Sequence, residues 1–184
     1  MATDASYAQS RIGSDFRAQG RCPSAKITPL TNNATQLTSK LRGLNARGGT
    51  AGHLGIAWGY YMLSENWRSL WPTSADPEPY ASDVNKIAIL MTDGSFNTAY
   101  SGLSSSQIAN QLCTDMKQPK AGNGGITVYS IAFNAPRDAE RILRNCATPD
   151  DGNQTYYYAP QSGHELESTF KEIAKSIQTL RLSK

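Results

Sequence analysis

At 184 residues, with 39% hydrophobic and 18% charged residues, the chain has the size and composition of one globular domain that can bury a core. The formal net charge is only +3, and the 18 Lys and Arg residues are scattered without a basic run that carries interleaved aromatic residues, which argues against a nucleic-acid partner. No apolar stretch reaches the roughly 18 to 20 residues that a membrane span needs, and the first residues do not have the pattern of a secretory signal peptide.

The first 24 residues are polar and are interrupted by Gly13, Gly20 and Pro23. This composition predicts an irregular lead-in, so we place the folded domain at residues 25–184. Residues 25–30 form a candidate strand, and Pro29 restricts that strand to the edge or the end of a sheet.

Two helices are expected next. Thr31 or Asn32 can cap the first helix, which should end near the glycines at 48–49. Thr50 is expected to open the second helix, which has a broad aromatic face for the core. The apolar positions at helical spacing are Ala34, Leu37, Leu41 and Leu44 in the first helix, and Leu54, Ala57, Trp58, Tyr61 and Met62 in the second. Residues 65–85 are rich in Trp, Pro, Ser and Asp and should form a surface loop.

Five consecutive apolar residues at 87–91 predict a short strand that is covered on both faces. The run is closed by Thr92, Asp93 and Gly94. In an open parallel sheet, ligands bind just beyond the carboxyl ends of the strands, which is where Asp93 would lie. Asp-Gly is also a common turn dipeptide, so a plain turn is the alternative.

The second half of the chain alternates between strand and helix patterns. A helix is marked by Ile108, Leu112 and Met116, and a strand spans residues 126–133. The next helix starts at Pro136, and its residues Ala139, Ile142, Leu143 and Cys146 should share one face. A short strand spans residues 155–158, and a capping box from Ser162 to Glu165 opens a long final helix with an apolar stripe at Leu166, Phe170, Ile173, Ala174, Ile177 and Leu180. This alternation predicts an α/β fold with a doubly wound, mostly parallel sheet.

The three cysteines are Cys22, Cys113 and Cys146, and their spacing shows no zinc-binding pattern. Two successive right-handed crossovers would place the helices that carry Cys113 and Cys146 side by side on one face of the sheet. A disulfide between them is geometrically plausible and would indicate an oxidising compartment. Two buried free thiols are the alternative.

Thr50 and Asp93 are expected at the same edge of the sheet. A hydroxyl and a carboxylate are hard oxygen ligands that Mg²⁺, Mn²⁺ or Ca²⁺ accepts, with water or a partner's carboxylate completing the shell. A competing hypothesis is a hydrolytic enzyme that uses Asp93 with His53 or His164. The sequence has no Gly-x-Ser-x-Gly elbow and no phosphate-binding loop to support such an enzyme.

Several short motifs occur in a particular order along the chain. They are Cys22-Pro23, Ile27-Thr28-Pro29-Leu30-Thr31, Gly48-Gly49-Thr50, Gly55-Ile56-Ala57-Trp58-Gly59, Ile89-Leu90-Met91-Thr92-Asp93-Gly94, Leu112-Cys113, Gly125-Ile126-Thr127-Val128-Tyr129-Ser130-Ile131-Ala132-Phe133, Cys146-Ala147 and Leu180-Arg181-Leu182. From about Cys22 to Lys184, the chain therefore resembles the von Willebrand factor A domains and, among them, the tight-adherence (TadE/TadG-like) group of Flp-pilus assembly proteins.

The resemblance implies a metal-ion-dependent adhesion site that holds a divalent cation. In that site, Thr50 would be the threonine ligand of the second motif and Asp93 the aspartate of the third. The resemblance also implies a bridge between Cys113 and Cys146, a location in the bacterial cell envelope facing the periplasm, and a pilus or envelope protein as the partner.

One part of the family pattern is missing. The first motif, Asp-x-Ser-x-Ser after a central strand, does not occur; Asp4-Ala5-Ser6 begins like it but Ala8 does not complete it. We therefore expect that the first central strand and the membrane anchor of the family are absent. This chain would then be the carboxyl-terminal part of a longer protein, or the product of a gene truncated or split at Met1. The strand at 87–91 should then expose one edge, which would lead to local repacking or to pairing with another chain, such as a dimer partner.

These observations predict a non-catalytic binding or adhesion module of a pilus-assembly or cell-surface protein, with a metal site that is incomplete in this chain. The alternative is a metal-free remnant that serves in packing or oligomerisation.

Overall fold

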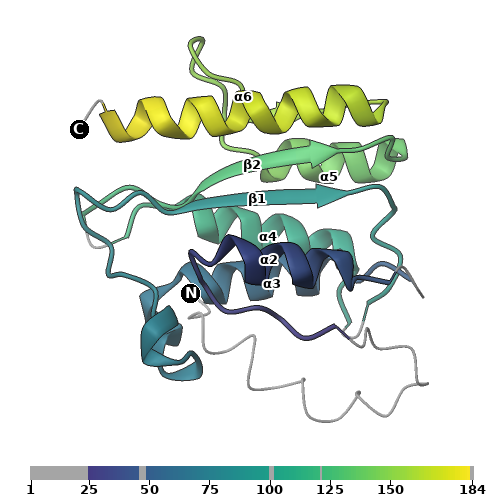
Figure 1. Ribbon diagram of the computed structural model, residues 1–184. Helices are drawn as coiled ribbons and strands as arrows, with labels where there is room; N and C mark the ends of the chain where they lie inside the picture. The colour runs from purple at the N-terminus through teal and green to yellow at the C-terminus, as the bar shows by residue number, and fades with distance from the viewer. Residues whose placement is uncertain (1–24, 46–48, 100–101, 121, 183–184) are drawn as a thin grey trace.

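The structure is a computed structural model that describes residues 25–45, 49–99, 102–120 and 122–182. The expected lead-in at residues 1–24 lies outside the described residues. The elements in chain order are α2 (Ala34–Arg42), α3 (Gly52–Leu63), the 3-10 helices η1 (Glu65–Leu70) and η2 (Thr73–Ala75), β1 (Ile87–Thr92), α4 (Ser105–Lys117), β2 (Thr127–Ala132), α5 (Arg137–Cys146), β3 (Tyr157–Tyr158) and α6 (Gly163–Leu182) (Figure 1).

The three strands form one parallel sheet in the order β1-β2-β3. Because parallel neighbours need a crossover, α4 connects β1 to β2 and α5 connects β2 to β3. Side chains alternate across the sheet: Val128 on β2 packs with the helices α3, α4 and α5, whereas its neighbour Tyr129 packs with Ile173 of α6. The molecule is therefore an α/β protein with helices on both faces of a parallel sheet, which confirms the predicted class.

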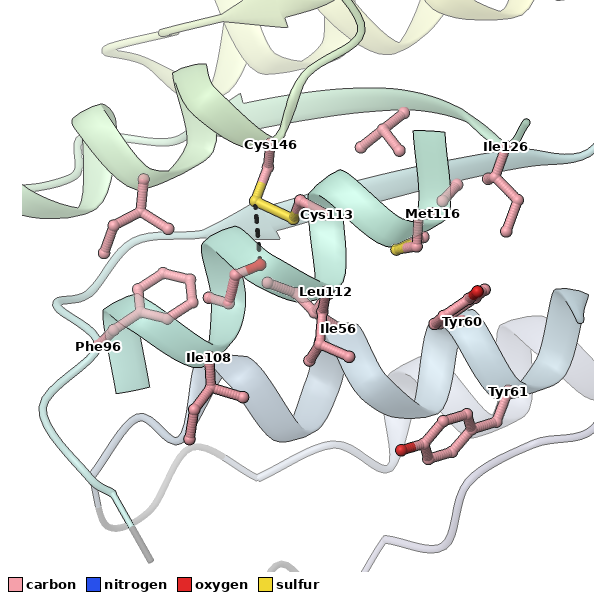
Figure 2. Packing of buried hydrophobic residues seen from close by; sticks show 14 of the residues in the cluster. Ile56, Tyr60, Tyr61, Phe96, Ile108, Leu112, Cys113, Met116, Ile126 and Cys146 are labelled. Carbon is pink, nitrogen blue, oxygen red and sulfur yellow. Dashed lines mark hydrogen bonds between the residues drawn. A yellow bond between two sulfur atoms is a disulfide. The ribbon is translucent and has the colours of Figure 1, made fainter. Parts of the chain in front are cut away.

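The larger part of the core lies between the sheet and the helices α3, α4 and α5 (Figure 2). Ala109, Cys113 and Met116 on α4 are fully buried, because α4 lies between α3 and α5. The helical spacing of Ile108, Leu112 and Met116 predicted this face. On α5, the four residues expected to share one face are all buried: Ala139, Ile142, Leu143 and Cys146.

A disulfide joins Cys113 of α4 to Cys146 of α5, with 4.9 Å between the two Cα atoms. The order of elements had left a disulfide and two buried free thiols as the alternatives, and the structure contains the disulfide. Both cysteines are buried. Beside it, the Lys117 ammonium donates hydrogen bonds to the carbonyl oxygens of Asn145 and Ala147 at 2.7 and 2.9 Å. A cation at the last carbonyls of a helix is favourable, so Lys117 caps α5 and ties it again to α4.

The expectation that the strand at 87–91 is covered on both faces is wrong for one face. Ala88 is buried against the α4 side, but Ile89 and Met91 on the α6 side are 42% and 46% exposed. The physical reason is the position of β1 at the edge of the sheet, where α6 does not reach over the whole strand. In the part of the chain that the structure describes, β1 pairs with β2 alone.

The amino-terminal elements differ from the sequence predictions in three places. Residues 25–30 form no strand. The cap of α2 is Asn33, whose side chain accepts a hydrogen bond from the Gln36 N–H at 2.9 Å, and α2 ends at Arg42, well before residues 48–49. No residue of α2 is buried, so its apolar stripe contributes little to the core.

The helix α3 begins at Gly52, two residues later than predicted. It buries His53, Ile56, Tyr60 and Tyr61, of which only Tyr61 was predicted, whereas the predicted Ala57 and Trp58 are half-buried against the core. The residues of α3 are apolar on all sides of the helix, so their spacing alone could not identify which side is buried. The expected surface loop at 65–85 is partly folded into η1 and η2 and is held by Lys86, whose ammonium donates to the carbonyl oxygens of Leu63 and Glu78.

The final helix packs on the other face of the sheet. Ser162 accepts a hydrogen bond from the Glu165 N–H at 3.2 Å, as predicted, but the Glu165 carboxylate accepts from the N–H of Gln161 instead of closing the box on Ser162. Of the predicted stripe, Ile173 is fully buried while Phe170 is 39% exposed. None of the described helices has the length and apolar character needed to cross a membrane.

Replacing Cys113 and Cys146 together by alanine should lower the free energy of unfolding by roughly 3 to 4 kcal/mol, because the bridge closes a loop of 33 residues in the unfolded chain. Urea unfolding followed by circular dichroism measures the loss. The wild type in reductant should behave like the double variant. An unfolding midpoint that is the same with and without reductant would show that the bridge contributes nothing.

Candidate functional site

The candidate site lies at the carboxyl end of β1, where residues 93–98 form a loop. The Phe133 N–H donates to the Thr92 carbonyl oxygen at 3.1 Å, so the ends of β1 and β2 are held in register. The loop therefore starts from a defined point on the sheet, at the edge where ligands bind in open parallel sheets.

A short segment before α3 is fastened to this loop. The Thr50 N–H donates to the Asn97 side-chain oxygen at 2.9 Å. In return, the Thr50 carbonyl oxygen accepts from the N–H groups of Asn97 and Thr98, each at 3.2 Å. Three hydrogen bonds thus join Thr50 to residues 97 and 98 of the loop, and they place Thr50 beside the end of β1.

Glycines allow the two segments to approach closely. A Cβ on Gly94 would lie 3.2 Å from the Thr50 hydroxyl oxygen, and a Cβ on Gly49 would lie 2.8 Å from the Thr98 hydroxyl oxygen. A Cβ on Gly52 would lie 2.1 Å from an atom of the Phe96 ring, which is buried. The structure therefore brings Thr50 next to the Asp93-Gly94 turn, as the sequence predicted, although Thr50 precedes α3 and does not open it.

The oxygen atoms at this end of the sheet come from different elements. Asp93 is exposed at the tip of β1, and the Thr50 hydroxyl lies beside the next residue, Gly94. The Ser95 hydroxyl donates to the Asp138 carboxylate in the first turn of α5 at 3.0 Å. This loop thus joins α3, β1 and α5 through polar contacts, and Asp93 is the exposed carboxylate on it.

Thr50 and Asp93 fit a divalent cation in ligand type, because a hydroxyl and a carboxylate both offer hard oxygen atoms. They do not complete a coordination shell, since Mg²⁺ takes six ligands and Ca²⁺ six to eight. Among the residues that the structure describes, no group of three or more His, Cys, Asp or Glu side chains could hold a metal ion. A cation here would need most of its ligands from water or from another chain.

His53 lies in the core. Its Nδ1 atom is 2.7 Å from the Ser105 hydroxyl oxygen, and both residues are buried. Burial lowers the pKa of His53 below the usual 6.5, so the imidazole is neutral at pH 7. This contact ties the first turn of α3 to the first residue of α4, which is a packing role. His164, by contrast, is exposed at the second position of α6.

Sequence reasoning did not identify Asn97, which carries the contact to Thr50. The residue sits in a loop without a motif, and its partner is distant in sequence, so no local pattern marks it. The same holds for Ser95 and Asp138.

No protein-family model matches the chain, and a search of curated proteins found no match.

Asn97→Ala should loosen the Thr50 segment, because the alanine offers no acceptor to the Thr50 N–H and only the two backbone hydrogen bonds to the Thr50 carbonyl oxygen remain. We expect a loss of about 1 kcal/mol in the free energy of unfolding and faster hydrogen exchange at the Thr50 amide. Asn97→Asp is the matched control, since a carboxylate keeps the acceptor. Equal exchange rates in Asn97→Ala and the wild type would contradict the role given to this contact.

The free energy of unfolding should fall as the pH drops below 6.5, the usual pKa of histidine, because the unfolded chain then binds a proton that buried His53 resists. The contribution is fully present above that pH and is lost toward the lowered pKa of the folded state. Urea unfolding at a series of pH values should give a flatter profile for His53→Gln. A variant profile with the wild-type slope between pH 7 and 5 would exclude His53 as the cause.

Proposed function

We propose that this chain is a non-catalytic binding module, similar to the carboxyl-terminal part of a von Willebrand factor A domain, in a pilus-assembly or cell-surface protein of the bacterial envelope. In this proposal, Thr50 and Asp93 hold a divalent cation at the end of β1, and a protein partner completes the ion's coordination. The finer fold assignment, a Rossmann-like A domain without its first central strand, belongs to the same proposal.

The observation that carries the proposal is the position of Thr50. Its hydroxyl oxygen would lie 3.2 Å from a Cβ on Gly94, directly beside Asp93 in the chain. The two residues come from segments more than 40 positions apart, and the hydrogen bonds to Asn97 hold them together. The Asp93 side chain is exposed there, and a carboxylate beside a hydroxyl offers the hard oxygen ligands that a divalent cation accepts.

The disulfide supports the proposed location. The bridge between Cys113 and Cys146 is the kind that persists in the periplasm or at the cell surface and is rare in a reducing cytosol. An envelope protein of this size gains stability from such a bridge.

A metal-free structural or oligomerisation module is the second candidate, and one observation favours it. The described residues contain no group of three acidic or metal-binding side chains. A hydrolytic enzyme has less support, because His53 is buried against Ser105 in the core.

The experiment is a thermal melt of the full chain with chelator and then with excess Mg²⁺, Mn²⁺ or Ca²⁺. A cation at about a hundred times its dissociation constant should add about 2.7 kcal/mol, which raises the melting temperature by several degrees for a chain of this length. Asp93→Ala and Thr50→Val should abolish the rise. Asp83→Ala is the matched control, because Asp83 is an exposed aspartate just before the other end of β1. A wild type that no cation stabilises would favour the metal-free module.

A further inference from the structure

The outer edge of β1 has hydrogen-bonding groups without a strand to pair with in the described part of the chain. The carbonyl oxygens of Lys86 and Thr92 accept from β2, from the N–H groups of Thr127 and Phe133. In a parallel ladder, alternate residues direct both backbone groups to the same neighbour. The intervening residues, Ile87, Ile89 and Met91, therefore direct their N–H and C=O groups away from β2.

The same residues expose apolar side chains. Ile89 and Met91 lie on the α6 face of β1 and are the exposed residues of this strand. The Glu172 carboxylate of α6 accepts a hydrogen bond from the Tyr158 hydroxyl, so the flank of α6 that carries Glu172 faces β3. Phe170 is also exposed and lies on the opposite flank of the helix, which is the flank nearer β1. An apolar strip thus runs along the free edge.

This edge lacks the features that keep exposed strands apart. Protective edges carry lysines, prolines, bulges or very short strands. The run from Ile87 to Thr92 has six residues, no charge and no proline, and it pairs with β2 without a bulge. The nearest lysine, Lys86, is buried with its ammonium bound to Leu63 and Glu78. An edge with these features pairs readily with another strand.

We propose that the edge is covered by a second copy of this chain, with the two β1 strands paired antiparallel across a two-fold axis. Antiparallel pairing centred on Ile89 sets Ile89 opposite its counterpart and Ile87 opposite Met91. Every outward backbone group then meets an outward group of the other copy, and no like charges face each other, since Lys86 meets Thr92. The interface is self-complementary, as two-fold symmetry requires.

Other occupants from the chain itself fit less well. Residues 1–24 contain no apolar run that could form a strand buried on both faces. The strand β2 is already paired on both sides, with β1 and with β3. Pairing of one strand buries less than the 1,200 to 2,000 Å² or so of a standard interface. The helix α2, drawn below β1 in Figure 1, exposes Leu37 and Leu41 as further apolar surface.

The test is the oligomeric state of the full chain, measured by sedimentation equilibrium and by hydrogen exchange. The wild type should sediment at twice the mass of one chain, with the amides of Ile87, Ile89 and Met91 protected. Ile89→Lys and Met91→Lys should sediment as monomers with fast exchange at these three amides, because each two-fold interface would bury two unpaired ammonium groups. Both positions are exposed in the monomer, so the variants should keep the wild-type circular dichroism spectrum.

Leu70→Lys is the matched control, since Leu70 is an exposed apolar residue of η1, outside the proposed interface, and this variant should remain dimeric. A monomeric wild type overturns the proposal, as does a dimer that survives both β1 variants. Protection of the β1 amides in a monomeric wild type would point instead to another segment of the same chain. The proposal does not depend on the metal site, and the measurement is made in chelator to keep the two separate.

Discussion

The parallel pairing of β1 with β2 is the interaction on which the rest of the structure depends. It runs without interruption from Ile87 to Thr92, and it obliges the chain to cross over through α4 before it returns. That crossover places α4 against α5, where the disulfide can form. It also brings the carboxyl ends of both strands to one edge, so that the loop after Asp93 starts from a rigid sheet.

Stability is unevenly distributed around this pairing. Fully buried side chains are concentrated on β2, α4 and α5, where the disulfide and Lys117 add further connections. On the opposite side, β1 exposes one apolar face and no residue of α2 is buried. Regions with few buried contacts open at lower free energy than the core. The candidate site lies at the boundary, held by the sheet on one side and by the hydrogen bonds of Asn97 on the other.

The sequence predicted best those features that depend on a local pattern of residues, such as the buried face of a helix. The helices α4 and α5 have one apolar face each, so spacing identified their buried residues. Spacing failed for α3, which is apolar all round, and could not show that β1 is an edge strand, since a continuous apolar run such as Ile87 to Met91 is equally typical of a central strand. The approach of Thr50 to Gly94 was predicted from topology, but the residue that holds it, Asn97, pairs across 47 positions and carries no local signal.

The outer edge of β1 and the candidate site at its carboxyl end are neighbours. Met91, the last residue of β1 with an outward amide, precedes Asp93 by two positions, and Asp93 directly follows the end of β1. One end of any strand that pairs with the outer edge of β1 must therefore lie close to the Asp93 carboxylate. In the antiparallel register centred on Ile89, Asn85 of the second copy lies opposite Asp93. Two events that change the surroundings of one carboxylate are thermodynamically linked, and the effect of each on the other is equal. In the two proposals made above, pairing at the edge and cation binding at its tip would be linked equilibria, each changing the affinity of the other by the same factor.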